Sequence, residues 1–85
     1  QSFAKWEHVF VGAFQALRRK VESGQPSVLD GYGATGPQEF FAVAVETFFE
    51  RPAELQREDA EVYRQLVSLF ELDPASWAGD SWLDQ

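Results

Sequence analysis

The stretch YGATGPQEFFAVAVETFFERP, residues 32–52, decides the fold of this 85-residue chain because it predicts an exceptionally apolar helix. Pro37 suits a first helical turn, where its missing N–H costs nothing, and Pro52 ends the pattern. On a helical wheel, residues 39–50 are apolar around most of the circumference. We therefore expect a helix that ends near Glu50 and is buried on more than one side.

Three glutamates interrupt this apolar helix, and they share one narrow strip of its surface. Glu39, Glu46 and Glu50 fall within about 40° of one another on the wheel. Glu46 and Glu50 are an i,i+4 pair of like charges, which costs a few tenths of a kcal/mol when exposed. One interpretation is a solvated acidic face balanced by water and a nearby arginine. The other is a cation held by Glu39, with the remaining acids around it.

A first helix is predicted ahead of this segment by apolar side chains at spacings of three and four residues. Its apolar stripe consists of Phe3, Trp6, Val9, Phe10, Phe14, Leu17 and Val21. The residues expected on its opposite, polar face are His8, Gln15 and Arg19.

Residues 23–36 are rich in Gly, Pro, Ser and Asp and predict a loop. A loop of this length is often functional. We expect Val28 and Leu29 to anchor it in the core. Thr35 and Gln38 have the spacing of a capping box, which would start the second helix.

Two more helical segments follow the apolar helix. PAELQRE, residues 52–58, predicts a short turn of helix, and a third main helix begins near Asp59 and stops at Asp73-Pro74. Its apolar stripe consists of Val62, Tyr63, Leu66, Leu69 and Phe70. No strand pattern or repeat is visible, so we expect an all-α fold of three main helices plus a short helical turn. We expect one helical unit over residues 1–85. Its tail, residues 75–85, shows no clear hydrophobic period, which leaves a flexible tail as one alternative.

Composition excludes several classes of function. A net charge of −7 argues against direct binding to nucleic acid or to an anionic membrane, and LRRK at residues 17–20 is the one basic cluster. No apolar run approaches the length of a membrane span. The chain has no cysteine, which removes disulfides and thiolate metal sites. It also has no methionine, so we expect it to be processed or cut from a longer protein.

The chain is not expected to bind a metal ion alone. Zinc sites use three or four protein ligands from His, Cys and carboxylates, and the one histidine, His8, lies on the polar face of another helix. Glu39 and Glu46 are seven residues apart, which is about 10.5 Å along a helix, too far to converge. If Glu39 is a metal ligand, its partner ligands lie outside these residues.

The segments LDGYGATGPQEFFAVAVETFFERPAEL, residues 29–55, and YRQLVSLFELDP, residues 63–74, resemble the C-terminal part of the Mlc titration factor family. Members of that family are cytoplasmic bacterial zinc peptidases of the gluzincin type. The resemblance extends from Trp6 to Pro74. The shorter pattern Tyr-Gly-x-Thr-x-x-x-Glu-Phe-Phe-Ala, residues 32–42, is also similar to the end of the anthrax lethal factor protease domain.

The resemblance implies the C-terminal portion of a zincin-like catalytic domain. It implies that Glu39 is the third zinc ligand, that Tyr32 donates a hydrogen bond to the tetrahedral intermediate, and that Glu46 has a supporting role near the metal. The His-Glu-x-x-His helix that supplies the other two ligands and the general base is absent from the sequence. Zinc and a peptide substrate are therefore expected in the longer parent protein, and the chain alone is expected to be inert and zinc-free.

A second class of function is protein interaction without catalysis. The resemblance implies a sugar-responsive transcriptional repressor as partner, because the namesake of the family sequesters one. Trp77 and Trp82 are candidate anchors, since tryptophan is enriched at such interfaces; they could equally fold back onto the domain. Self-association is a further alternative, because it would cover apolar sides of the second helix.

Overall fold

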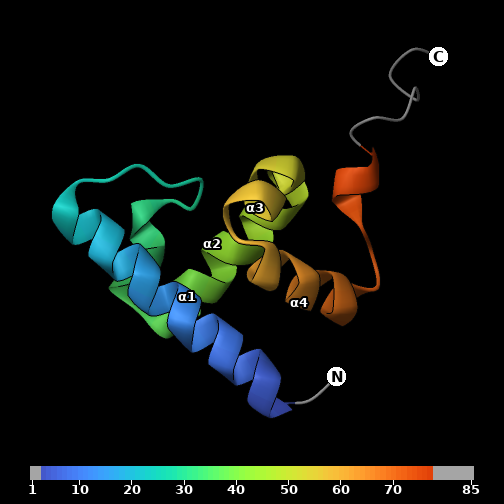
Figure 1. Cartoon of the computed structure of the whole chain (residues 1–85), viewed down its shortest axis with the longest axis horizontal. Helices are drawn as coiled ribbons and strands as arrows, with labels where there is room; N and C mark the ends of the chain where they lie inside the picture. The colour runs from blue at the N-terminus through green and yellow to red at the C-terminus, as the bar shows by residue number, and fades with distance from the viewer. Residues whose placement is uncertain (1–2, 78–85) are drawn as a thin grey trace.

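The computed structural model describes residues 3–77 of the chain, and this part is helical with no strand (Figure 1). The α-helices are α1 (Phe3–Ser23), α2 (Pro37–Glu50), α3 (Pro52–Glu58) and α4 (Ala60–Phe70), and two 3-10 helices are η1 (Gly31–Thr35) and η2 (Pro74–Trp77). The predicted all-α fold of three main helices and one short one is confirmed. Trp82 and the tail from residue 78 lie outside the described residues, and no helix within residues 3–77 is both long and apolar enough to cross a membrane.

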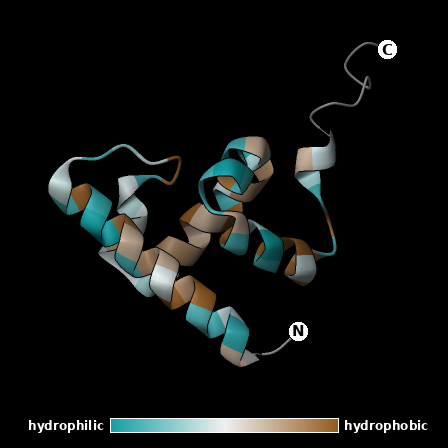
Figure 2. Ribbon diagram, in the orientation of Figure 1, coloured by the Kyte–Doolittle hydropathy of each residue, from teal (hydrophilic) through white to brown (hydrophobic). Residues whose placement is uncertain are grey.

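Helix α2 lies at the centre of the fold, as its composition predicted. It contacts α1, η1, α3 and α4, and α1 crosses it in Figure 1. Its buried side chains are Phe40, Val43, Ala44, Thr47 and Phe48. Figure 2 shows apolar residues along α2, whereas polar and apolar residues alternate along α1. The one buried polar side chain of α2, Thr47, donates its hydroxyl to the Val43 carbonyl at 2.7 Å, so its burial leaves no polar group unsatisfied.

Aromatic rings join α2 to its neighbours on two sides. Phe40 meets Phe10 and Phe14 of α1 edge to face, with centroids 6.0 and 5.9 Å apart. Phe48 lies 5.2 Å from the ring of Tyr63 in α4. Each such pair adds about 1 kcal/mol beyond the area that it buries. The core is therefore continuous from α1 through α2 to α4.

Some sequence predictions at the helix ends are wrong. Thr35 and Gln38 form no capping box, because Gly36 is the N-cap of α2 and makes no side-chain cap, while the Thr35 hydroxyl donates to the Tyr32 carbonyl. On the predicted apolar stripes, the outermost positions extend past the core and are exposed. These are Val21 of α1 and Leu69 and Phe70 of α4.

Tyr63 ties the segment after α4 to the core. Its hydroxyl donates to the Asp73 carboxylate and accepts a hydrogen bond from the Ala75 amide at 2.8 Å. Burial, reinforced by the hydrogen bond to Asp73, raises the pKa of Tyr63 from its ordinary value of 10.0 to about 12. A raised phenol pKa contributes stability that is complete below pH 10 and is lost as the pH rises toward 12.

We expect Tyr63→Phe to lower the free energy of unfolding by about 2 kcal/mol at neutral pH, because it removes both hydrogen bonds. The difference between the protein and the variant should stay constant up to about pH 10 and shrink toward pH 12. Urea unfolding measured at a series of pH values checks this. A difference that stays unchanged through this window would contradict the assignment.

The 3-10 helix η1 approaches both α1 and α2 closely at the buried Gly33. A Cβ atom at this position would lie 3.2 Å from Leu17 Cδ2 and 3.2 Å from Val43 Cβ. Both neighbours are buried core side chains with little room to shift. The absence of a side chain at Gly33 therefore sets how near η1 sits to the core.

We expect Gly33→Ala to destabilise the protein by about 1–3 kcal/mol through overpacking. Gly12→Ala is the matched control, because a Cβ there would meet nothing within 4 Å in the middle of α1, and it should stabilise by about 0.5–1 kcal/mol. Urea unfolding of both variants makes the comparison. Equal stability of the two variants would show that η1 is not packed in this way.

Candidate functional site

The two principal site residues predicted from sequence lie on one short continuous unit. Tyr32 is the second residue of η1, and Glu39 is in the first turn of α2. Only Gly36 separates η1 from α2. Because η1 packs against both α1 and α2, the positions of Tyr32 and Glu39 relative to each other are set by the fold.

The backbone around Tyr32 is held firmly while its side chain is exposed. The Asp30 carboxylate caps η1 by accepting the Tyr32 amide at 2.8 Å, and the Asp30 carbonyl accepts the Gly33 amide at 2.9 Å. At the other end of η1, the Thr35 hydroxyl donates to the Tyr32 carbonyl at 2.7 Å. The side chain is 61% exposed, and its hydroxyl has no hydrogen-bond partner within residues 3–77. The phenol is thus available to a ligand.

The Glu39 carboxylate lies back over the start of its own helix. Its side chain is half-buried, and one oxygen occupies the space that a side chain at Gly36 would fill. The N-terminus of a helix favours negative charge at this place. Within residues 3–77 the carboxylate has no ion pair or hydrogen bond. The Glu39 oxygens are therefore available to a ligand, and one of them lies in the space left by the absent side chain of Gly36, which we call the cradle.

These donors fit one ligand of a metal site and no more. Carboxylate oxygens are ordinary zinc ligands, but a complete site needs three or four ligands. Among the described residues, no group of three His, Asp or Glu side chains is close enough to hold an ion. Any ion held by Glu39 thus needs further ligands from other polypeptide.

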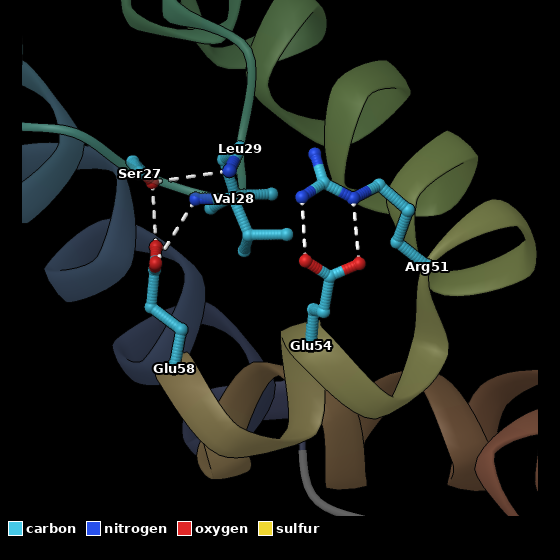
Figure 3. A network of polar contacts seen from close by, with 6 residues as sticks. All are labelled: Ser27, Val28, Leu29, Arg51, Glu54 and Glu58. Carbon is cyan, nitrogen blue, oxygen red and sulfur yellow. Dashed lines mark hydrogen bonds and ion pairs between the residues drawn. The ribbon is translucent and has the colours of Figure 1, made fainter.

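The other two acids of the strip point away from the core. Glu46 and Glu50 are exposed and have no ion pair within the part of the chain that the structure describes. The nearest basic residue in sequence, Arg51, instead binds Glu54 with both ends of its guanidinium, at 2.8 and 2.6 Å (Figure 3). The hydrogen bond to Arg51 lowers the pKa of Glu54. The strip is therefore not neutralised by the arginine that follows it.

A glutamate that the sequence did not single out anchors the loop ahead of η1. Glu58, at the end of α3, accepts the Ser27 hydroxyl at 2.5 Å and the Val28 amide at 2.9 Å (Figure 3). Lys20 of α1 lies 3.4 Å from the same carboxylate. Partial burial alone would raise the pKa of Glu58, but the bonds from Ser27 and Val28 and the charge of Lys20 together lower it. No local sequence pattern reveals this contact, because Val28 and Ser27 lie 30 and 31 residues before Glu58 in the sequence.

Leu29 and Val28 lie as predicted for the loop. Leu29 is buried in the core and Val28 packs against it. The first helix also presents His8, Gln15 and Arg19 to solvent as expected. His8 is therefore exposed on α1, and among the described residues it belongs to no group of three potential metal ligands.

Comparison with known proteins identifies the family of this chain. The chain belongs to the glucose-regulated metallo-peptidase M90 family, whose sequence profile matches residues 1–71. This confirms the resemblance identified from the sequence.

Individual relatives give the same assignment. An uncharacterized protein of Synechocystis sp. is 42% identical over 72 residues, covering 85% of this chain and 26% of that protein. Mlc titration factor A of Serratia proteamaculans is 30% identical and that of Edwardsiella ictaluri 29% identical, each over 76 residues, which is 87% of this chain and 29% of the relative. The chain thus spans less than a third of the length of these curated relatives. No solved structure gives a significant match to it.

We expect Gly36→Ala to displace the Glu39 carboxylate, because the new methyl group would occupy its place. The backbone should not change, since Gly36 has φ 178° and ψ 165°, an extended conformation open to any residue. The measurement is the NMR chemical shift of the Glu39 side-chain carboxyl carbon. Gly31→Ala is the control, because a Cβ there makes an ordinary 3.5 Å contact with Val21. An unmoved Glu39 resonance in Gly36→Ala would contradict this geometry.

Proposed function

We propose that this chain is part of the catalytic domain of a zinc-dependent peptidase, to which it contributes the third zinc ligand, Glu39, and a tyrosine that stabilises the transition state, Tyr32. The observation that carries the proposal is a Glu39 carboxylate without a partner in residues 3–77 and an exposed Tyr32, on two consecutive helices separated only by Gly36. Membership of a metallopeptidase family supports it.

The proposed role of Glu39 is to supply its carboxylate as a ligand of the metal ion. A zinc ion, when bound, polarises a substrate carbonyl and activates water for attack. The N-terminus of α2 and the cradle at Gly36 orient the carboxylate before any ion arrives. Such preorganisation reduces the cost of binding.

The proposed role of Tyr32 is electrostatic. Hydrolysis of a peptide bond places negative charge on the former carbonyl oxygen, and a hydrogen-bond donor aimed at that oxygen stabilises the transition state. The phenol of Tyr32 has no partner among residues 3–77 to compete for its proton. Its backbone is bonded through Asp30 and Thr35, which fixes the point from which the side chain extends.

The rest of the machinery is proposed to come from polypeptide outside these 85 residues. Two further zinc ligands and a general base, expected from a His-Glu-x-x-His helix, would complete the site. Glu46 has a supporting role two turns along α2, where its charge would act on the metal or its ligands. Zinc and peptide substrate therefore bind the whole protein, in the bacterial cytoplasm, and the chain alone is inert.

In the whole protein, we expect Glu39→Ala to lose bound zinc and hydrolytic activity together. Tyr32→Phe should keep zinc and lower kcat by about 100-fold, because it removes one hydrogen bond made in the transition state. Zinc content by atomic emission and kcat on a peptide library measure the two effects. Glu50→Ala is the control, since it removes an exposed carboxylate from the same helix and should change neither.

Three outcomes would contradict the proposal. One is full zinc content in Glu39→Ala, and another is unchanged kcat in Tyr32→Phe. The third is zinc binding by residues 1–85 alone with micromolar or tighter affinity, measured by calorimetry, because the single ligand supplied here should not suffice.

A second candidate function is binding of a transcriptional repressor without catalysis. Mlc titration factor A among the relatives and an exposed apolar patch favour it. The patch consists of Phe49, Leu69, Phe70 and Leu72, which are 36–46% exposed. The two candidates differ in their dependence on Glu39, because repressor binding should survive Glu39→Ala and hydrolysis should not. The side chain of Trp77 and all of Trp82 lie outside the described part of the chain.

A further inference from the structure

We propose that Glu58 is a positioning residue for Tyr32: from the end of α3 it holds the loop that leads into η1, and so sets where the phenol lies. This inference rests on the proposed function of Tyr32. It assigns a role to a side chain that no sequence motif includes.

The contacts of Glu58 with the loop are strong and use both carboxylate oxygens. Oε2 accepts the Ser27 hydroxyl at 2.5 Å and Oε1 accepts the Val28 amide at 2.9 Å (Figure 3). Hydrogen bonds to a charged acceptor are about twice as strong as neutral ones. The ion pair with Lys20, at 3.4 Å and partly exposed, adds little by itself. Glu58 is therefore mainly a clamp on the loop and only secondarily a partner of Lys20.

Two further hydrogen bonds are made by loop residues on either side of Ser27 and Val28. The Gln25 amide bonds to the Lys20 carbonyl at 2.8 Å, which ends α1. The Leu29 amide donates to the Ser27 hydroxyl oxygen at 3.0 Å. Ser27 therefore connects Glu58 to Leu29 through two consecutive hydrogen bonds. The amide of Val28 and the hydroxyl of Ser27 donate to Glu58 and to no other acceptor within residues 3–77.

A displacement of the loop at Val28 would be transmitted to Tyr32 through few residues. Leu29 is buried, and the next residue, Asp30, caps η1 through the Tyr32 amide at 2.8 Å. One residue thus separates the clamped Val28 from the cap. A shift of the loop at Val28 moves Asp30 and rotates η1, and a misplacement of about 1 Å at a catalytic group can cost about 100-fold in rate.

Glu54 is a matched control on the same helix. It lies one turn before Glu58, carries the same charge, and pairs with Arg51 at 2.6 Å, with no hydrogen bond to the loop among residues 3–77. Replacing either glutamate by alanine removes one negative charge from α3, and the helix dipole makes the loss at Glu54, in the first turn, the more costly of the two for the helix itself. Loss of the loop clamp affects Glu58 alone.

The test uses the whole protein with Glu58→Ala, Glu58→Gln and Glu54→Ala. We expect Glu58→Ala to lower kcat by about 10- to 100-fold with KM and zinc content unchanged. Glu58→Gln should lose less, because its amide oxygen still accepts the Val28 amide. Glu54→Ala should keep full kcat. Equal losses in Glu58→Ala and Glu54→Ala would overturn the inference.

A double-mutant cycle separates positioning from general damage. In a Tyr32→Phe background there is no hydroxyl left to misplace, so Glu58→Ala should cause less than a threefold further loss of kcat. The full 10- to 100-fold loss in both backgrounds would overturn the inference while leaving the proposed function intact. Unchanged kcat in Tyr32→Phe would overturn both.

Amide hydrogen exchange provides a readout without catalysis. Exchange at Val28, Tyr32 and Gly33 should be at least tenfold faster in Glu58→Ala, with exchange in α4 and in Glu54→Ala unchanged. If Glu58→Ala does not fold, Glu58→Gln and Ser27→Ala serve for the same measurement. Wild-type exchange at Tyr32 in a folded variant would overturn the inference.

Discussion

The structure depends on the burial of α2 from several sides at once. Phe, Val and Ala side chains cover most of the circumference of α2, which is more apolar surface than one neighbouring helix can bury. α1, η1, α3 and α4 therefore all pack against it. At Gly33, η1 approaches α1 and α2 so closely that an added Cβ would lie 3.2 Å from side chains of both Leu17 and Val43. This close approach places Tyr32 beside the first turn of α2, and the candidate site follows from packing rather than from any bond between the site residues.

The acidic residues of this fold fall into two groups, those that bind a partner in the described chain and those that do not. Asp30, Glu54, Glu58 and Asp59 are engaged in caps, ion pairs or loop contacts. Glu39, Glu46 and Glu50 have no such partner in the described chain. Each unpaired acid on one face repels the others, so a cation or a basic surface at that face would be stabilising.

The sequence alone could predict most of the fold, and it supplied the candidate site residues Tyr32 and Glu39 as predictions. Helix bounds near Pro37, Pro52 and Asp59 followed from local chemistry, since prolines and caps act within one turn. It could not predict that Gly36 rather than Thr35 is the N-cap of α2, because the competing bond from Thr35 to the Tyr32 carbonyl exists only once η1 has formed. Nor could it predict η1 itself, whose cap by Asp30 looks in sequence like an ordinary turn.

What the sequence by itself determined was the all-α class, the central apolar helix, and the acidic strip with Glu39 at its head, because helical periodicity is a local property. The tertiary structure alone decided which acids are free and what holds the loop before Tyr32. The contact of Glu58 with Ser27 and Val28 joins residues about thirty positions apart. Such a pairing depends on how α1 and α3 lie against α2, and no spacing within a single helix encodes it.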